Sequence, residues 1–272
     1  MTLTFERLSL NQATTEHSTT EELVSACATH GVSGVAPWRH QLVGGDAAKT
    51  RALLDDHGVV ASSLCRGGFF TNRDAGEALD DNRRAVDEAC ELGAASLVLV
   101  CGPVTEAGFR DAESRIVDGI ASLADHAADA NVALAIEAFH PMFAAQRSAV
   151  VTLAQAVRLA RLVSRPEVGV VVDTYHVWWD PELMSSLEAA TGLVRGVHVA
   201  DWLVPTTDLL AGRGLPGDGI IDLAGILRAV DAGGYDGWIE VEVLNAEVWS
   251  RSADEVVSDI CGRMTTLIAE AA

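Results

Sequence analysis

Short apolar runs alternate with longer amphipathic stretches along the whole chain. Runs such as Ser96–Cys101 and Val168–Asp173 are apolar at nearly every position, which is typical of strands that are covered on both faces. The stretches between the runs carry apolar residues at helical spacing. The pattern predicts strands at Leu3–Leu10, Gly34–Pro37, Val59–Leu64, Ser96–Cys101, Val132–Ala138, Val168–Asp173, Val194–Ala200 and Trp238–Val243. It predicts helices at Thr20–His30, Asp46–His57, Glu77–Leu92, Glu113–Ala130, Ala149–Val163, Pro181–Ala190, Asp222–Asp231 and Ala253–Glu270.

The helix boundaries and the order of the elements indicate one architecture. Thr19–Glu22 opens the first helix with capping residues and early acids, and Gly31, Gly58 and Gly93 follow predicted helix ends as C-terminal caps. Strands that are each followed by a helix are typical of a parallel (β/α)₈ TIM barrel, an α/β fold. The chain has 272 residues, the usual length of one such barrel, and shows no linker. We therefore expect a single TIM-barrel domain over residues 1–272.

Composition and charge narrow the class of protein. The hydrophobic fraction of 49% and the charged fraction of 21% are those of an ordinary globular protein. With 39 acidic and 19 basic residues the formal charge is −20, which repels a phosphate backbone. The chain has no apolar run of membrane-spanning length, no signal-peptide pattern and five scattered cysteines that fit reduced thiols. The sequence predicts a cytoplasmic protein with no nucleic-acid partner and no membrane partner.

Four successive predicted strands carry an ionisable side chain at or near their carboxyl ends: Glu137, Asp173, His198 and Glu242. In a parallel barrel these ends meet at one face, where catalytic groups lie. Each residue alone could cap the following helix, but converging carboxylates repel one another and are costly to bury. A divalent cation removes that cost. Three carboxylates with one imidazole suit Mn²⁺, Mg²⁺ or Co²⁺ better than a structural zinc site, so we expect one divalent metal ion here.

Five segments carry a resemblance to a known family: Leu134–Met142, Val170–His176, Gly196–Asp201, Leu215–Gly219 and Gly234–Glu242. Over essentially its whole length the chain resembles the sugar phosphate isomerase/epimerase superfamily, the xylose isomerase-like TIM barrels that include AP endonuclease family 2. The resemblance implies that the four strand-end residues bind the metal. It also implies that Glu137 and Glu242 do acid–base work on opposite faces of a small carbohydrate substrate, in a protein that forms homodimers or homotetramers.

The last strand leaves the fourth metal ligand open. Glu240 and Glu242 lie two residues apart, so period-two alternation places both on the same face of the strand. Periodicity therefore does not choose between them, and the resemblance favours Glu242.

Four further residues are candidates for substrate binding. His176 lies three residues after Asp173, and in the family such a histidine approaches a substrate hydroxyl; it could instead orient a metal ligand. Arg213 resembles a family arginine that binds a hydroxyl or phosphate oxygen, unless it is a solvated loop residue. His140 follows the Glu137 strand, and Arg66 follows the third predicted strand beside two glycines.

Other residues in the predicted loops stay without a firm role. Trp38, Trp178, Trp179 and Trp202 follow predicted strands and could form aromatic walls or pack elsewhere. Few basic residues lie in these loops, which disfavours a phosphorylated substrate, although Arg39, Arg66, Arg147 and Arg213 leave it open.

The resemblance implies a metal-dependent isomerase or epimerase of a small ketose, keto-sugar or related polyol ketone, with two glutamates transferring protons through an enediolate. The alternative is a lyase of the same superfamily, resembling inosose dehydratases or enzymes that eliminate from 3-keto-glycosides. A DNA-repair endonuclease is disfavoured because the third and fourth strands lack the histidines of a trinuclear zinc site. A barrel that only binds a sugar is disfavoured by the intact set of convergent ionisable groups.

Overall fold

Nine strands of the described residues form one parallel sheet that curls into a barrel. In the computed structural model, which describes residues 3–71 and 74–272, the order in the sheet is β3-β2-β1-β11-β8-β7-β6-β5-β4, and every pairing within it is parallel. The strands are β1 (Leu8–Asn11), β2 (Gly34–Ala36), β3 (Val60–Ala61), β4 (Leu64–Gly68), β5 (Ser96–Val100), β6 (Ala133–Glu137), β7 (Val168–Asp173), β8 (Val194–Val199) and β11 (Ile239–Val241).

The third predicted strand closes the ring. β3 and β4 are successive pieces of it and stand at the two ends of the sheet order. The Cys65 N–H donates to the carbonyl of Pro37 over 3.1 Å, and Trp38 and Cys65 form a parallel bridge, so β4 also lies against the segment that follows β2. Eight barrel strands thus enclose a common interior, which confirms the predicted TIM barrel.

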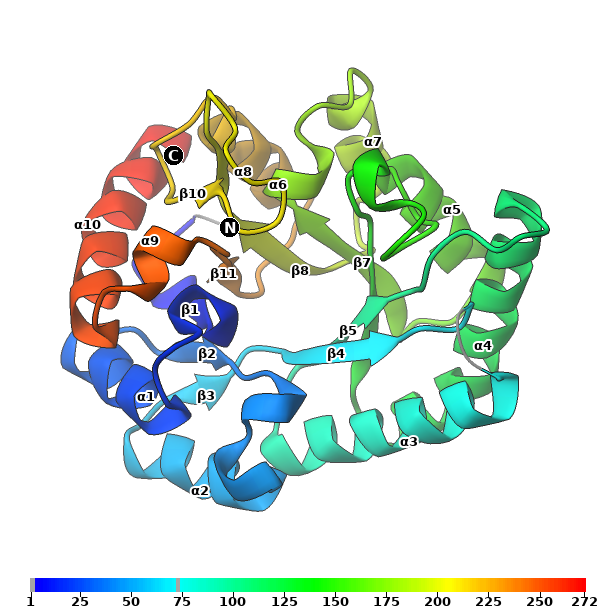
Figure 1. The fold of residues 1–272 in the computed structure, drawn as a ribbon, viewed down its shortest axis with the longest axis horizontal. Helices are drawn as coiled ribbons and strands as arrows, with labels where there is room; N and C mark the ends of the chain where they lie inside the picture. The colour runs from blue at the N-terminus through cyan, green and yellow to red at the C-terminus, as the bar shows by residue number, and fades with distance from the viewer. Residues whose placement is uncertain (1–2, 72–73) are drawn as a thin grey trace.

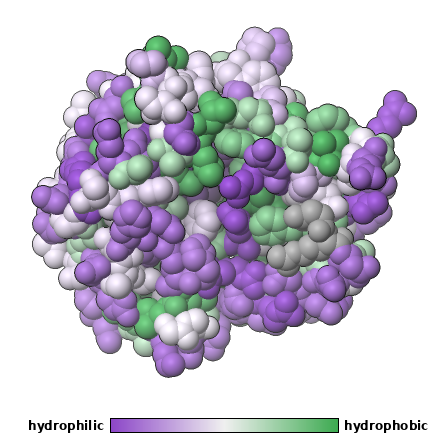
Figure 2. All heavy atoms as spheres, in the orientation of Figure 1, coloured by the Kyte–Doolittle hydropathy of each residue, from purple (hydrophilic) through white to green (hydrophobic). Residues whose placement is uncertain are grey.

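Helices surround the strands as an outer layer (Figure 1). The long helices are α1 (Thr20–Thr29), α2 (Ala47–Asp56), α3 (Ala75–Leu92), α4 (Phe109–Asp129), α5 (Leu153–Val163), α7 (Leu183–Ala189), α8 (Leu223–Ala232) and α10 (Ala253–Ala271), and each matches a predicted helix within a few residues. Within the described ranges, no helix is long and apolar enough to cross a bilayer. Figure 2 shows a mainly hydrophilic face, as expected for a chain with a formal charge of −20.

The capping residues act as their sequence positions predict. Thr19 and Glu22 form a capping box, in which the Glu22 N–H donates to Thr19 Oγ1 and the Thr19 N–H donates to Glu22 Oε2. Gly93 ends α3 with φ of 77°, a left-handed conformation that glycine adopts at little cost. Gly31 and Gly58 also have positive φ, just after α1 and α2.

Four predicted boundaries are wrong by four residues or more, and one of them is the start of α4 at Phe109 instead of Glu113. Residues Phe5–Arg7 form a 3₁₀ turn, in which the Arg7 N–H donates to Thr4 O, so the first strand begins only at Leu8. The third barrel strand continues four residues beyond Leu64, to Gly68. The helix predicted from Ala149 begins at Leu153, because the Ala149 N–H donates to Gly102 O and Thr152 provides the N-cap.

Short elements at the carboxyl ends of the strands carry no periodic signal and are absent from the predicted set. They are α6 (Thr174–Val177), α9 (Ala246–Trp249) and the antiparallel pair β9 (Asp201–Trp202) and β10 (Arg213–Gly214). In Figure 1, α6, α9 and β10 lie near the ends of β7, β11 and β8. These elements shape the surroundings of the strand-end residues.

Candidate metal centre and its cavity

The barrel interior brings the four predicted strand-end residues together. Ala135 and Val171 pack with Cys65 and Val98 in a small apolar cluster inside the barrel. Side chains two residues further along a strand point to the same side, so the next inward positions of β6 and β7 are occupied by Glu137 and Asp173. Their neighbours in the ring complete a buried cluster, called here the carboxylate–histidine cluster: Glu137, Asp173, His198 and Glu242.

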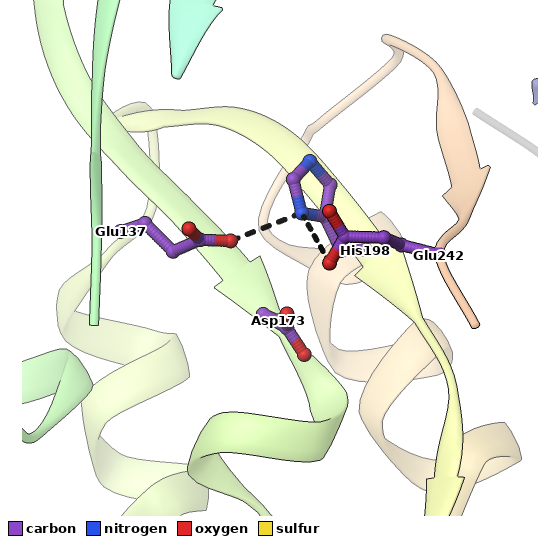
Figure 3. Close-up of side chains that lie close together, drawn as sticks. All are labelled: Glu137, Asp173, His198 and Glu242. Atoms are coloured by element: carbon purple, nitrogen blue, oxygen red, sulfur yellow. Dashed lines mark hydrogen bonds and ion pairs between the residues drawn. The ribbon is translucent and has the colours of Figure 1, made fainter. Parts of the chain in front are cut away.

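The ligand atoms of the cluster lie close enough to share one metal ion. One ligand atom of each residue lies within 4.8 Å of those of the other three. His198 Nδ1 is 3.1 Å from Glu137 Oε1 and 3.8 Å from Glu242 Oε2. Figure 3 shows Glu137 and Glu242 pointing toward His198 from two sides, with Asp173 beside them at the end of its strand. The two glutamates therefore face each other across the site.

Arg213 enters the same site from β10. Its Nη1 donates to Glu242 Oε2 over 2.8 Å and lies 3.4 Å from Asp173 Oδ2. The guanidinium stacks over the Tyr175 ring, with 4.7 Å from Cζ to the ring centroid, and Nη2 lies 3.4 Å from His176 Nε2. Arg213 is therefore a buried partner of two cluster carboxylates rather than a solvated loop residue.

The two acids of the last strand lie on different sides of His198. Glu240 Oε1 accepts a hydrogen bond from Asn11 Nδ2 over 2.6 Å and lies 3.4 Å from His198 Nε2. Glu240 Oε2 accepts hydrogen bonds from the hydroxyls of Ser62 and Ser63. Both acids point into the barrel, as the alternation predicts. Of the two, Glu242 belongs to the group of residues that could hold a metal ion, and Glu240 does not.

Burial and mutual charge shift the pKa values of the cluster. Burial, reinforced by the charges of Glu242 and Glu137 and opposed by Arg213, raises the pKa of Asp173 to about 7. Burial also raises the pKa of Glu137, against the effect of its hydrogen bond to His198. Burial lowers the pKa of the His198 imidazole, but the nearby carboxylates outweigh it, Glu240 most, and raise that pKa well above its usual value.

The donor set fits a divalent metal ion. Three buried carboxylates and one imidazole converge, and each would be costly to bury without a cation. Carboxylate oxygens with a single imidazole suit hard or borderline divalent ions. A metal-binding histidine typically donates its second ring N–H to a carboxylate, and Glu240 lies on that side of His198.

A cavity of about 320 Å³ opens on the cluster. Glu137 and Glu242 reach its lining together with His176 and Arg213. Burial, with the charge of Arg213, lowers the pKa of His176 well below its usual value, so this histidine is neutral. Its ring stacks on Phe139 at 4.3 Å between centroids. The other lining residues, some of which the sequence did not single out, include Glu16, Trp38, His40, Cys65, Arg66, Val100, Phe139, Phe143, Arg147, Leu210 and Trp249.

Two predicted candidates lie elsewhere. His140 is not among the described residues that line this cavity, because its ring stacks on Trp202 and meets the edge of Trp179, each at 5.5 Å between centroids. Arg39 forms ion pairs with Asp81 and Glu88 instead of facing the cavity. The prediction of His140 as a substrate-binding residue therefore finds no support in its position.

The partners of Glu240 are residues that the sequence analysis did not identify. In β1, Ser9 and Asn11 alternate with Leu8 and Leu10, and all four side chains are buried. Polar residues at every second position of a fully buried strand point into the barrel interior. That alternation is the signal by which Asn11 could have been found.

The fold and the cluster define a TIM barrel with a candidate metal site at the carboxyl ends of its strands. Residues 24–260 match the family described as xylose isomerase-like TIM barrel. The chain belongs to this family, which confirms the resemblance seen in the sequence.

Relatives with known activities include isomerases, an epimerase and dehydratases. A 3-dehydroshikimate dehydratase of Pseudomonas putida is 29% identical over 244 residues, which cover 84% of this chain and 36% of the relative. A ketose 3-epimerase of Arthrobacter globiformis is 28% identical over 220 residues, which cover 75% of this chain and 70% of the relative. An inosose isomerase of Bacillus velezensis is 25% identical over 268 residues, which cover 92% of this chain and 93% of the relative. The chain thus spans only about a third of the dehydratase but most of the other two relatives.

Solved structures share the whole fold. A protein of Sinorhizobium meliloti 1021 is 43% identical, with a TM-score of 0.92 and coverage of 97% of this chain and 99% of that one. The IOLI protein, whose structure holds a zinc atom, has a TM-score of 0.87 at 22% identity, with coverage of 98% and 99%. At 22% identity, the similarity to the IOLI protein shows only that the two proteins share a fold.

Proposed function

We propose that the protein is a divalent-metal-dependent isomerase or epimerase of a small ketose, keto-sugar or related polyol ketone. The observation that carries the proposal is the pair Glu137 and Glu242, which approach His198 from two sides within one cluster that opens into a cavity. Two carboxylates on opposite sides of a bound substrate can remove a proton on one side and return it on the other. The names of the ketose 3-epimerase and inosose isomerase relatives agree with such chemistry.

The carboxylate–histidine cluster would hold the metal ion. The zinc atom in the related barrel structure of the IOLI protein supports metal binding in this architecture. When bound, a divalent cation supplies positive charge that acidifies a C–H bond beside a carbonyl. Mn²⁺, Mg²⁺ and Co²⁺ suit the oxygen-rich donor set.

The protein's own side chains would move the protons. Glu137 would accept a proton from the carbon beside the substrate carbonyl, acting as a general base from one side of the site. Glu242 would return a proton from the opposite side, and Arg213, 2.8 Å from Glu242 Oε2, holds that carboxylate in place. The neutral His176 would donate or accept a hydrogen bond at a substrate hydroxyl.

A lyase is the second candidate. The 3-dehydroshikimate dehydratase relatives favour it, since a dehydration beside a carbonyl begins with the same proton removal. The difference lies in the next step, in which a hydroxyl or an aglycone leaves instead of a proton returning.

Deuterium exchange tests the proposal. The protein with Mn²⁺ is incubated in D₂O with a panel of ketoses, keto-acids and cyclic polyol ketones, and incorporation at carbon is followed by NMR and mass spectrometry. We expect deuterium next to the carbonyl of at least one compound, with a rate that falls by at least about a hundredfold in Glu137→Gln and in Glu242→Gln. Glu106→Gln, which changes an exposed acid of the same type, is the matched control.

The products separate the two candidates. A deuterated isomer or epimer with the mass of the substrate supports the isomerase. Loss of water or of an aglycone supports the lyase. No exchange and no elimination with any compound would reject both.

A further inference from the structure

Two arginines share the cavity with the carboxylate–histidine cluster. Arg66 lies on β4, and Arg147 lies on the loop between β6 and α5. The Arg66 guanidinium packs over the rings of Trp38 and Phe69, with 5.0 and 5.4 Å from Cζ to the centroids. Stacking on aromatic faces steadies the planar group and leaves its N–H edges available.

The two guanidiniums differ from most others in the described part of the chain. Within residues 3–71 and 74–272, no hydrogen bond or ion pair joins the guanidinium of Arg66 or Arg147 to a carboxylate. Most other arginines pair with one, as Arg7 does with Asp231 and Arg39 with Glu88. Acidic residues outnumber basic ones by 39 to 19, so partners are abundant in this chain. Two arginines without a carboxylate partner on the lining of one cavity therefore need an explanation.

The two guanidiniums repel each other, which favours the binding of an anion. Burial and, to a lesser extent, the positive charge of Arg147 lower the pKa of Arg66, and the smaller opposing effects of Glu137 and Glu242 do not cancel them. Like charges that share a partly buried site cost free energy unless an anion offsets them. Arginine's rigid fork of N–H groups matches carboxylate and phosphate oxygens.

We propose that Arg66 and Arg147 form an anion subsite that binds a carboxylate or phosphate of the substrate, while its carbonyl end lies at Glu137 and Glu242. This inference rests on the proposed function and narrows it to acidic or phosphorylated keto-compounds. Arg213 is not part of the subsite, because its guanidinium is already bonded to Glu242 and Asp173. The apolar residues Val100, Phe139 and Phe143 line the same cavity and would reduce competition from water.

Three matched ligands test the subsite: D-fructose, D-fructuronate and D-fructose 6-phosphate. They share the carbonyl end and differ only at C6, which is neutral, a carboxylate or a phosphate. Their affinities are measured by isothermal titration calorimetry with the Mn²⁺-loaded wild-type protein and with Arg66→Gln, Arg147→Gln and the double variant. Arg110→Gln, which removes the charge of an exposed arginine of α4, is the control.

We expect one or both anionic ligands to bind at least about tenfold more tightly than D-fructose, as for a charge-assisted hydrogen bond. The preference should fall in each single variant and disappear in the double variant, while Arg110→Gln keeps it. The tighter of the two anions identifies the subsite as one for carboxylate or for phosphate. Arg66→Lys and Arg147→Lys should keep part of the preference, and serve as the test if either glutamine variant does not fold.

Equal affinity for all three ligands overturns the subsite. So does a preference that survives in the double variant, or no measurable binding of either anion at millimolar concentration. The deuterium-exchange assay reports on the proposed function separately. If the protein prefers the anionic ligands but shows no deuterium exchange, the subsite stands and the isomerase is rejected. If it shows deuterium exchange but no preference for anionic ligands, the isomerase stands and the subsite is rejected.

Discussion

The Nε2 atom of His198 lies 3.4 Å from Oε1 of Glu240, on the side of the ring away from Glu137. Nδ1 therefore faces the carboxylate–histidine cluster, while Nε2 faces a carboxylate that Asn11, Ser62 and Ser63 hold in place. A carboxylate at one ring nitrogen fixes the imidazole's orientation and favours the tautomer with the proton on that nitrogen. Glu240 therefore lies where it would orient His198 as a ligand of the proposed metal ion.

Replacing Glu240 by glutamine tests this positioning role. The amide is nearly the same size but carries no charge, so it stabilises the Nε2 proton of His198 less well. We expect the affinity for Mn²⁺ to fall by about 10–100-fold, as for other partners of metal-binding histidines. Calorimetric titration with Mn²⁺ measures the change, and Glu106→Gln is the control. An unchanged Mn²⁺ affinity in a folded Glu240→Gln protein would contradict the role.

Most of the barrel could be predicted because its strands and helices each carry a strong local signal. Strands such as β7 are apolar at nearly every position, and α1 begins with a capping box. The misplaced boundaries depend on non-local contacts. The end of β4, for instance, is set by Asn82, whose side chain binds both backbone groups of Gly68 from a different element. No pattern within residues 64–68 indicates that contact.

The candidate site could be predicted only as far as strand register determines it. Glu137 and Asp173 end their strands, so their meeting follows from the barrel itself. The distinction between Glu240 and Glu242 depends on depth inside the barrel, which period-two alternation does not report. The position of His140 could not be predicted for a similar reason, since its ring packs on Trp202 through a loop conformation that has no local signature.

The affinity for metal should rise with pH through about 7. The pKa of Asp173 is raised to about 7, chiefly by burial, and the pKa of His198 is raised well above its usual value by neighbouring carboxylates. Metal binding requires both groups without their protons, so protons must leave the metal-free protein when an ion binds. Each proton released should strengthen Mn²⁺ binding by about tenfold per pH unit.

Calorimetric titrations with Mn²⁺ at about pH 6 and about pH 8 test this dependence. Repeating each in two buffers with different heats of ionisation counts the protons released. An affinity for Mn²⁺ that stays the same at both pH values, or rises toward acid pH, would contradict the predicted increase of affinity with pH.

The stability of the barrel should depend on Asn82. Its Oδ1 accepts a hydrogen bond from the Gly68 N–H over 2.6 Å, and its Nδ2 donates to the carbonyls of Gly68 and Ala78, each over 2.8 Å. Asn82→Ala removes all three bonds and takes from the buried Gly68 its side-chain acceptor and donor, while the Ala78 carbonyl keeps its bond within the helix. We expect the free energy of unfolding to fall by about 3 kcal/mol.

Urea unfolding followed by circular dichroism measures this loss. Glu91→Ala, at an exposed position of the same helix, is the control and should change the free energy of unfolding by less than about 0.5 kcal/mol. Equal effects of the two substitutions would mean that Asn82 does not hold the end of β4.

Arg213 should weaken metal binding while stabilising the metal-free protein. Its Nη1 lies 2.8 Å from Glu242 Oε2 and 3.4 Å from Asp173 Oδ2, and both carboxylates belong to the carboxylate–histidine cluster. In Arg213→Met the buried carboxylates lose this cation, and we expect the metal-free protein to lose about 3–5 kcal/mol of stability. The variant should bind Mn²⁺ at least about tenfold more tightly, because the repulsion between guanidinium and metal is gone.

Thermal unfolding in EDTA and in Mn²⁺, together with calorimetry, measures both effects of the Arg213 substitution. Mn²⁺ should raise the melting temperature of Arg213→Met more than that of the wild type, since the ion replaces the lost positive charge. Arg213→Lys keeps a charge near the same carboxylates and should fall between the two. If Arg213→Met bound Mn²⁺ more weakly than the wild type, Arg213 would be acting mainly to hold Glu242 in its binding position, and the competition between guanidinium and metal would be disproved.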